Sequence, residues 1–196
     1  MKKEMIIKCS EESMTSATHP RTYSTTASAR VNNEITNYSI LAKTSSEGRG
    51  KYPVIEIANW FLYKCPMTHK KLQKLCYYAQ AWNYAINNFR LEDTDYQAWI
   101  HGPVSPVLYE KFKSFRYETI HIQGMMKSNI EKKDRRILED VWDTYGNMTG
   151  NALEALSHRE LPWIDARRGF QVNERCDVVI SPETMKKYDN SIATGK

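Results

Sequence analysis

The sequence has no long hydrophobic run, and this argues against a membrane-spanning helix. No stretch approaches the roughly 18 apolar residues that a membrane span needs. Met1–Lys3 is basic, like the start of a signal peptide, but Lys8 interrupts the short apolar stretch that follows. We therefore expect a soluble, cytoplasmic protein that does not act at a membrane.

Cysteine is scarce, and its spacing argues against both a disulfide framework and a metal centre. Cys9, Cys65, Cys76 and Cys176 form no Cys-x-x-Cys pair, which favours reduced thiols. Cys65 and His69 have the spacing of half a zinc site, but zinc takes four ligands and the chain has no suitable second pair. We expect no metal and no other cofactor.

The usual catalytic motifs are missing as well. Ser105 lacks the Gly-x-Ser-x-Gly elbow, and Gly48–Gly50 is too short for a phosphate-binding loop. Cys176 with His101 or His158 would make a nucleophile and a base, but nothing in the sequence orients the base or supplies an oxyanion site. We expect no enzymatic activity, with a hydrolase as a minor alternative.

Charge is moderate rather than extreme. The net charge is +5, which serves solubility and does not by itself indicate nucleic acid. Lys70, Lys71 and Lys74 form a basic stripe, either a solvated helix start or a contact for an acidic partner. Without a helix-turn-helix pattern, a DNA-binding regulator is a minor alternative.

The strongest pattern present is a helix over Thr68–Ile86. Its apolar face is defined by residues at helical spacing, namely Leu72, Leu75, Cys76, Ala79, Trp82, Asn83 and Ile86. Thr68 is suited to cap its first turn. Because the opposite face becomes aromatic from Tyr77 onward, this helix is expected to be buried on more than one side and to be central.

Similar patterns predict further helices over 53–64, 105–116, 131–145, 149–156 and 181–189. Short strands are expected at 96–100, 119–122 and 178–180. Leu161–Trp163 is expected to break the chain. The predicted fold is therefore mainly α: a compact multi-helix domain around a central helix, with a few short strands.

Residues 1–52 have a different composition. Ten of the nineteen residues from Ser10 to Ser28 are Ser or Thr, too polar to offset the entropy cost of ordering. We expect an extension over 1–52, largely disordered alone, then a helical domain over 53–190 and a tail over 191–196. A short helix over 29–42 is possible, with an apolar face of Val31, Ile35, Tyr38 and Leu41. It either packs back on the domain or folds on a partner.

The turn His101–Pro106 separates an aromatic strand from the next helix. A Gly-Pro turn presents a stiff surface, which lowers the entropy cost of binding, although it equally serves to aim the helix. Exposed tyrosines make good interface anchors, although they equally serve as core. The predicted partner-binding residues are Val31, Ile35, Tyr38, Leu41, Lys70, Lys74, Tyr77, His101, Gly102, Pro103 and Tyr109.

From about Val54 to Tyr188 the chain resembles the Panacea domain, also called SocA-like, of bacterial and phage proteins. The resemblance rests on an ordered series: Ala58–Leu62, Thr68, Leu72–Trp82, Tyr96–Trp99, Gly102–Val104, Pro106–Tyr109, Leu138–Trp142, Tyr145–Gly146, Leu156–His158 and Pro162–Trp163. No single piece is diagnostic, but the series covers about two-thirds of the chain in order.

This resemblance implies an antitoxin that neutralises a cognate toxin by direct protein binding. The toxin is expected to be encoded next to it. In one relative the domain instead acts as an adaptor that delivers the toxin to a protease, so a proteolytic adaptor is the alternative. Extensions beside the domain are common in the family, so residues 1–52 are expected to hold toxin-specific contacts. No catalytic residues carry over.

Overall fold

The computed structural model describes residues 50–122 and 128–194, and this part of the chain is mainly helical. Its helices are α2 (Val54–Lys64), α3 (His69–Asn87), α4 (Pro106–Phe112), η2 (a 3₁₀ turn, Lys113–Phe115), α5 (Lys132–Tyr145), α6 (Gly150–Ser157), α7 (Leu161–Ala166) and α8 (Pro182–Thr194). The expected helix over 29–42, with Val31, Ile35, Tyr38 and Leu41, lies outside the described residues.

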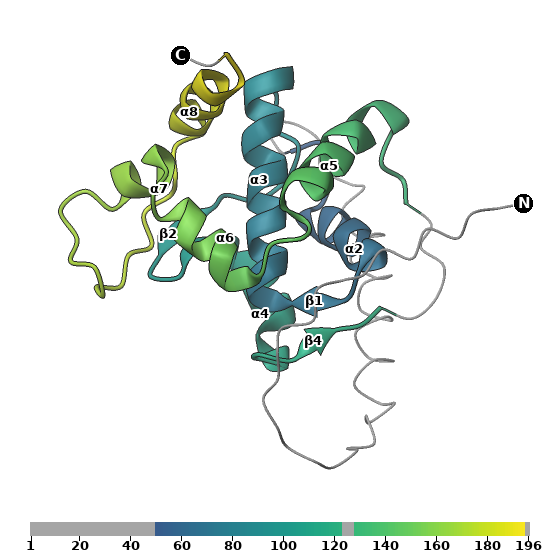
Figure 1. The fold of residues 1–196 in the computed structure, drawn as a ribbon, viewed down its shortest axis with the longest axis horizontal. Helices are drawn as coiled ribbons and strands as arrows, with labels where there is room; N and C mark the ends of the chain where they lie inside the picture. The colour runs from purple at the N-terminus through teal and green to yellow at the C-terminus, as the bar shows by residue number, and fades with distance from the viewer. Residues whose placement is uncertain (1–49, 123–127, 195–196) are drawn as a thin grey trace, which may run out of the picture.

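Helix α3 is central, as predicted. In Figure 1 it stands upright in the middle of the molecule, and α2, α5, α6 and α8 pack around it. Thr68 caps it by accepting a hydrogen bond from the Lys71 N–H, and Asn88 ends it with a left-handed φ of 57°. Ile86 is 59 % exposed, contrary to the prediction, because the last residues of the helix project beyond its neighbours.

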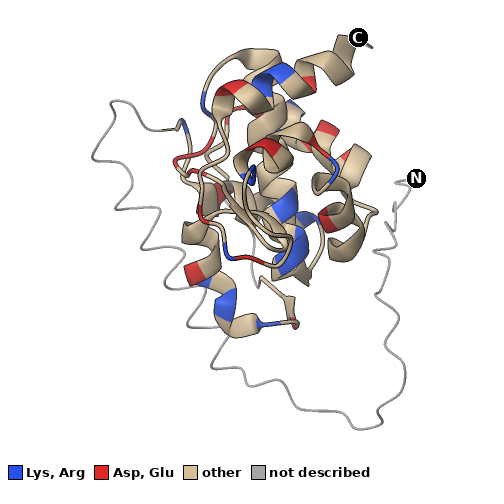
Figure 2. Cartoon of the chain, turned by 90° about the vertical axis from the view of Figure 1, so that its left-hand side faces the viewer, with Lys and Arg blue, Asp and Glu red and all other residues tan. Residues whose placement is uncertain are grey.

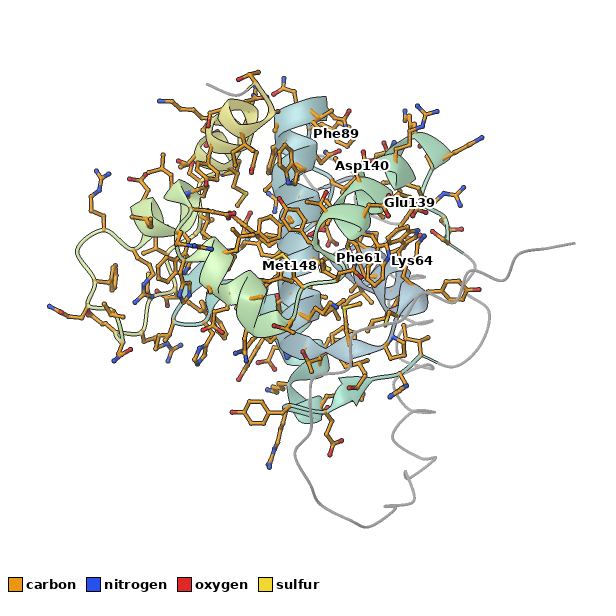
Figure 3. All side chains as sticks on the ribbon, in the orientation of Figure 1. Phe61, Lys64, Phe89, Glu139, Asp140 and Met148 are labelled. Carbon is orange, nitrogen blue, oxygen red and sulfur yellow. The ribbon has the colours of Figure 1, made fainter. Side chains whose placement is uncertain are left out.

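Helices α2 and α5 pack beside α3. Figure 3 labels Lys64 and Glu139, whose side chains form an ion pair of 2.6 Å between α2 and α5. Tyr52, in the segment expected to be the extension, is buried. Its N–H donates to Leu91 O at 2.8 Å and its hydroxyl donates to Asp134 at 2.6 Å, so this part of the chain is attached to the domain.

The strands form two small antiparallel pairs. β1 (Met67–Thr68) pairs with β4 (Thr119–Ile120), and β2 (Gln97–Trp99) pairs with β3 (Gly102–Val104). The second pair is a hairpin whose turn is Ile100–His101. The prediction of a stiff turn over His101–Pro106 is therefore wrong for Gly102–Val104, because the turn is tighter and these residues form the returning strand.

Two other local predictions need correction. Pro162 does not break the chain; it lies in the first turn of α7, where proline is tolerated because the missing N–H has no partner in a helix anyway. The expected strand at 178–180 forms a single bridge, Gln97 to Val179, beside the hairpin. Helix α8 also continues to Thr194, past its expected end at Asp189.

Cys76 and Cys176 are free and buried, as expected. Cys65 is disulfide-bonded, which departs from the expectation of reduced thiols. Among the residues that the structure describes, no helix is long and apolar enough to cross a membrane.

Two buried carboxyl groups lie where α7 and α8 meet the central helix. Glu160 precedes α7, and its Oε1 accepts a hydrogen bond from the Tyr78 hydroxyl at 3.0 Å. Burial raises the pKa of Glu160 to about 7, partly opposed by the Tyr78 bond. Burial, and then the nearby Glu160, raise the pKa of Asp189 to about 7 as well. Both groups therefore favour the protonated form in the folded protein.

Glu160→Gln is expected to stabilise the protein at alkaline pH. The stability that Glu160 contributes is fully present below its ordinary pKa of 4.5 and is lost as the pH rises through about 7. Glutamine cannot ionise and can still accept from Tyr78. Urea unfolding should show little difference at pH 4 and a gain of about 3 kcal/mol at pH 8. As a control, the exposed Glu118→Gln should change stability by less than about 0.5 kcal/mol. If Glu160→Gln gave an equal gain at pH 4 and pH 8, the buried carboxyl would not be the cause.

Candidate partner-binding pocket

The described part of the chain contains a pocket of about 660 Å³ on the side of α3 that faces the hairpin and α4. It lies over the first turns of α3, and the segments 116–117 and 175–176 also contribute to its lining. Four of the predicted partner-binding residues line it: Lys70, Lys74, His101 and Tyr109. The structure thus brings together residues that are up to 39 positions apart in the sequence.

Lys74 is not part of a solvated stripe. The residue is 1 % exposed, and its Nζ donates to the Pro103 carbonyl oxygen at 3.0 Å. Burial lowers the pKa of Lys74 to about 7; the nearby Glu154 raises it and Lys70 lowers it further. Lys70, one turn earlier on the same face of α3, remains partly exposed, because the hairpin covers the second turn of the helix more fully than the first.

Gly102 and Pro103 are buried, contrary to the expectation of an exposed binding loop. Gly102 has a φ of +93°, which favours glycine. A Cβ at this position would lie 2.7 Å from Lys74 Cε and 2.9 Å from Ser157 Oγ. Strand β3 therefore lies directly against α3 and α6 and forms a support for the pocket instead of a contact surface.

Tyr77 is also core and not an interface anchor. Its exposed fraction is 1 %, and its ring makes edge contacts with Tyr78 at 5.3 Å and Tyr96 at 5.5 Å between centroids. The packing of α8 against α3 covers this face of the helix. The sequence did not show which aromatic face would be covered.

Glu154 on α6 organises one side of the pocket mouth. Its Oε2 lies 2.7 Å from Lys70 Nζ, and its Oε1 lies 2.9 Å from His101 Nδ1. Burial raises the pKa of this carboxyl, but hydrogen bonds from Lys70 and His101 outweigh burial and lower it overall. His101, in the hairpin turn, is largely exposed, as predicted.

The pocket wall beside α4 is aromatic. Tyr109 is 37 % exposed, and its ring makes an edge contact with Trp99 at 4.9 Å. The centroid of the His69 ring lies 5.7 Å from that of Tyr109. Burial, with a smaller effect from Lys74, lowers the pKa of His69 to about 4, so this imidazole is neutral at neutral pH. Tyr109 thus remains partly exposed, and its role as an interface anchor stays a prediction.

Gln73 connects the central helix to the start of α4. Its Oε1 accepts from the Ser105 N–H at 2.8 Å, and its Nε2 donates to the Ser105 carbonyl oxygen at 3.1 Å. Ser105 in turn caps α4 through its hydroxyl. The wall carrying Tyr109 is therefore positioned by buried hydrogen bonds, which makes the pocket preformed.

The lining residues that the sequence did not mark for partner binding include Trp99, Arg116, Tyr117 and Arg175. Trp99 belongs to a predicted strand and to the family series, neither of which marks it as a pocket residue, and Arg175 lies in a polar loop without a motif. Arg116 has a φ of +51°, unusual for a residue with a side chain. No local signal marks these positions, because distant segments must fold together before they share a surface.

The pocket also contains two of the three residues of the minor hydrolase alternative. Cys176 and His101 both line it, but no hydrogen bond joins them in the described part of the chain. Cys176 Sγ lies 3.9 Å from the Ala166 carbonyl oxygen, and His101 engages Glu154. His158 stacks on Trp163, with a centroid distance of 4.1 Å. Within residues 50–122 and 128–194, no group of three His, Cys, Asp or Glu side chains could hold a metal ion.

Residues 72–164 match the model of the family described as antitoxin SocA-like, Panacea domain. The matched segment begins in the first turn of α3 and ends in α7, so it includes the central helix, the hairpin, α4 and Glu154. No curated protein and no solved structure matches the chain.

Proposed function

Residues 72–164 belong to the SocA-like Panacea family of antitoxin domains, and on this premise we propose that the protein is an antitoxin that silences a cognate toxin by binding it directly. The family match is the observation that carries the proposal. The toxin is occluded and not chemically altered, and the protein acts without turnover.

The geometry supports binding at the pocket face. The wall formed by Tyr109 and Trp99 combines exposed aromatic area with a position held by buried hydrogen bonds. Aromatic and arginine side chains in preformed depressions are typical centres of interface energy, and a preformed surface loses little entropy on binding. The proposed contact residues are Lys70, His101 and Tyr109 at the surface, with Lys74, Gly102 and Pro103 as the support beneath them.

We also propose that the extension over 1–52 adds toxin-specific contacts through Val31, Ile35, Tyr38 and Leu41. Four apolar residues at helical spacing on a short segment are typical of a helix that docks into a groove. Such a segment pays its ordering cost on binding, so its contribution tunes specificity more than affinity.

Co-expression with the product of the neighbouring gene tests the proposal. That product alone should stop growth, and the two proteins together should restore it and co-purify. A neighbouring product that is harmless alone, or the absence of a complex, would contradict the antitoxin function. A chain lacking residues 1–49 keeps Tyr52 and its bonds to the domain. Any loss of neutralisation by this truncated chain therefore measures how much the extension contributes to toxin neutralisation.

The same cells distinguish occlusion from proteolytic delivery. Under occlusion, the half-life of the toxin is unchanged or longer when the antitoxin is present. If the toxin instead disappears faster, and does so only while cellular proteases are active, the protein is an adaptor and not an occluding antitoxin.

A further inference from the structure

The pocket described above has an excess of uncompensated positive charge. Among its described lining residues Glu110 is the only carboxylate, and Lys113 neutralises it from outside at 2.5 Å. Lys70 is paired with Glu154. Arg116 and Arg175, in contrast, form no ion pair within the described residues. The cations left without a counter-ion are therefore these two arginines and Lys74.

Lys74 supplies a second, independent indication of a ligand. It is fully buried, and within the described residues its Nζ makes one hydrogen bond, to Pro103. An ammonium has three N–H donors and a neutral amine has two, so in either form at least one N–H of Lys74 has no protein acceptor among the described residues. Burying a cation without a carboxylate is costly, and this arrangement becomes favourable when an anion enters the pocket.

The walls restrict what kind of anion fits. Trp99 and Tyr109 form an edge-to-face pair, and Tyr117 at the rim is 91 % exposed. These rings offer area for apolar side chains on either side of a charged group. Arg116 carries its side chain on a strained backbone at the same rim, and strain of this kind is common at binding sites.

We propose that this pocket receives an acidic side chain of the partner protein, whose carboxylate lies between Arg116 and Arg175 above Lys74 while neighbouring apolar side chains cover Tyr109 and Tyr117. The inference rests on the proposed antitoxin function and specifies its chemistry: the toxin presents an aspartate or glutamate flanked by apolar residues. Arginine forks bind carboxylates bidentately, which adds direction to the contact.

Nucleic acid fits the same surface less well. A phosphate backbone needs an extended basic track, whereas Arg116, Arg175 and Lys74 all line a single pocket. Figure 2 shows the side of the molecule that lies at the left in Figure 1, and there Asp and Glu are interspersed with Lys and Arg. One carboxylate needs only the three cations.

The first test uses the purified full chain and short capped peptides. The probes are acetyl-Leu-Glu-Leu-Glu-amide and the matching glutamine peptide, and the readout is the indole N–H resonance of Trp99, which is bonded to Gln97 at 2.7 Å. The glutamate peptide should shift this resonance saturably and bind at least about 10-fold more tightly than the glutamine peptide, a factor equal to about 1.4 kcal/mol.

Charge reversal locates the site. Arg116→Glu and Arg175→Glu, singly and together, should weaken binding of the glutamate peptide by at least about 10-fold. Both positions are exposed, and unchanged thermal unfolding confirms that the variants fold. The control pair Arg135→Glu and Arg136→Glu, exposed on α5 and outside the pocket, should leave binding unchanged. Equal binding of the two peptides, no effect of the pocket variants, or tighter binding of inorganic phosphate or a thymidine octanucleotide would overturn the inference.

The second test uses the toxin identified by co-expression. The double pocket variant should fail to neutralise it, and selection for restored neutralisation should return toxin variants in which an acidic residue has become Lys or Arg. If the double variant neutralises normally, the pocket inference is wrong and the antitoxin function stands. If the glutamate peptide binds as expected but the neighbouring product is harmless, the function is wrong and the acidic specificity of the pocket stands.

Discussion

Replacing Gly102 with alanine is expected to lower the free energy of unfolding by about 2 to 5 kcal/mol. Two costs add. A φ of +93° is strained for any residue with a Cβ, at about 1 to 2 kcal/mol. The new methyl group would also lie 2.7 Å from Lys74 Cε and 2.9 Å from Ser157 Oγ, and overpacking of this kind costs about 1 to 3 kcal/mol.

Gly169 is a matched control for this prediction. It has the same φ of +93°, but a Cβ there would meet no atom within 4 Å. Gly169→Ala should therefore cost only the conformational part, about 1 to 2 kcal/mol. Urea denaturation of the two variants at one pH separates backbone strain from packing. Equal losses for both would show that the contact of β3 with Lys74 is not tight.

Replacing Lys74 with methionine is expected to stabilise the protein below neutral pH. The pKa of Lys74 is lowered from 10.5 to about 7, chiefly by burial. Between these values the folded protein has released a proton that the unfolded chain retains, so stability rises with pH across this interval. Below about pH 7 the full cost of burying the cation is present, at about 4 to 5 kcal/mol.

Methionine removes this cost and fills a similar volume, but leaves the Pro103 carbonyl oxygen without its donor, at about 1 kcal/mol. Lys74→Met should thus gain about 3 kcal/mol at pH 6 and little or nothing at pH 10. Urea unfolding from pH 6 to pH 10 measures both limits, with the exposed Lys187→Met as the control that should show no such trend. A loss of stability at pH 6 would mean that Lys74 is better solvated than its burial indicates.

Fold stability and partner binding then place opposite demands on Lys74. The variant that stabilises the fold removes the cation beneath the proposed carboxylate site, so it should be more stable and bind the glutamate peptide less well. Such an exchange of stability for binding is typical of functional sites. It also distinguishes Lys74 from Glu160, whose replacement should stabilise the protein without affecting the pocket.

Local patterns were sufficient for most of the helical framework. The spacing of Leu72, Leu75 and Cys76, the cap at Thr68 and the motif of Pro182 after Ser181 place α3 and α8 correctly, because helix formation and capping depend on residues within a few positions of one another. The order of the aromatic residues in the central segment likewise indicated the family resemblance. Residues 72–164 match that family.

Local patterns failed where the outcome depended on what covers a given face. Lys70 and Lys74 are both lysines on the same face of α3. Lys70 is nevertheless partly exposed, whereas Lys74 is buried under Gly102 and Pro103. Tyr77 and Tyr109 differ in the same way: Tyr77 is 1 % exposed on the face of α3 where α8 packs, whereas Tyr109 stays 37 % exposed beside Trp99.

The amino-acid sequence thus specified most of the helices that the structure describes, with α7 as an exception, and the family that the central segment resembles. The docking of the hairpin on α3 buried Lys74 and made Gly102 and Pro103 a support instead of a contact loop. The packing of segments 116–117 and 175–176 around the same pocket brought Arg116 and Arg175 into its lining. The physical reason is that secondary structure arises from short-range bonding and spacing, whereas burial and shared charge arise from contacts between residues far apart in the chain.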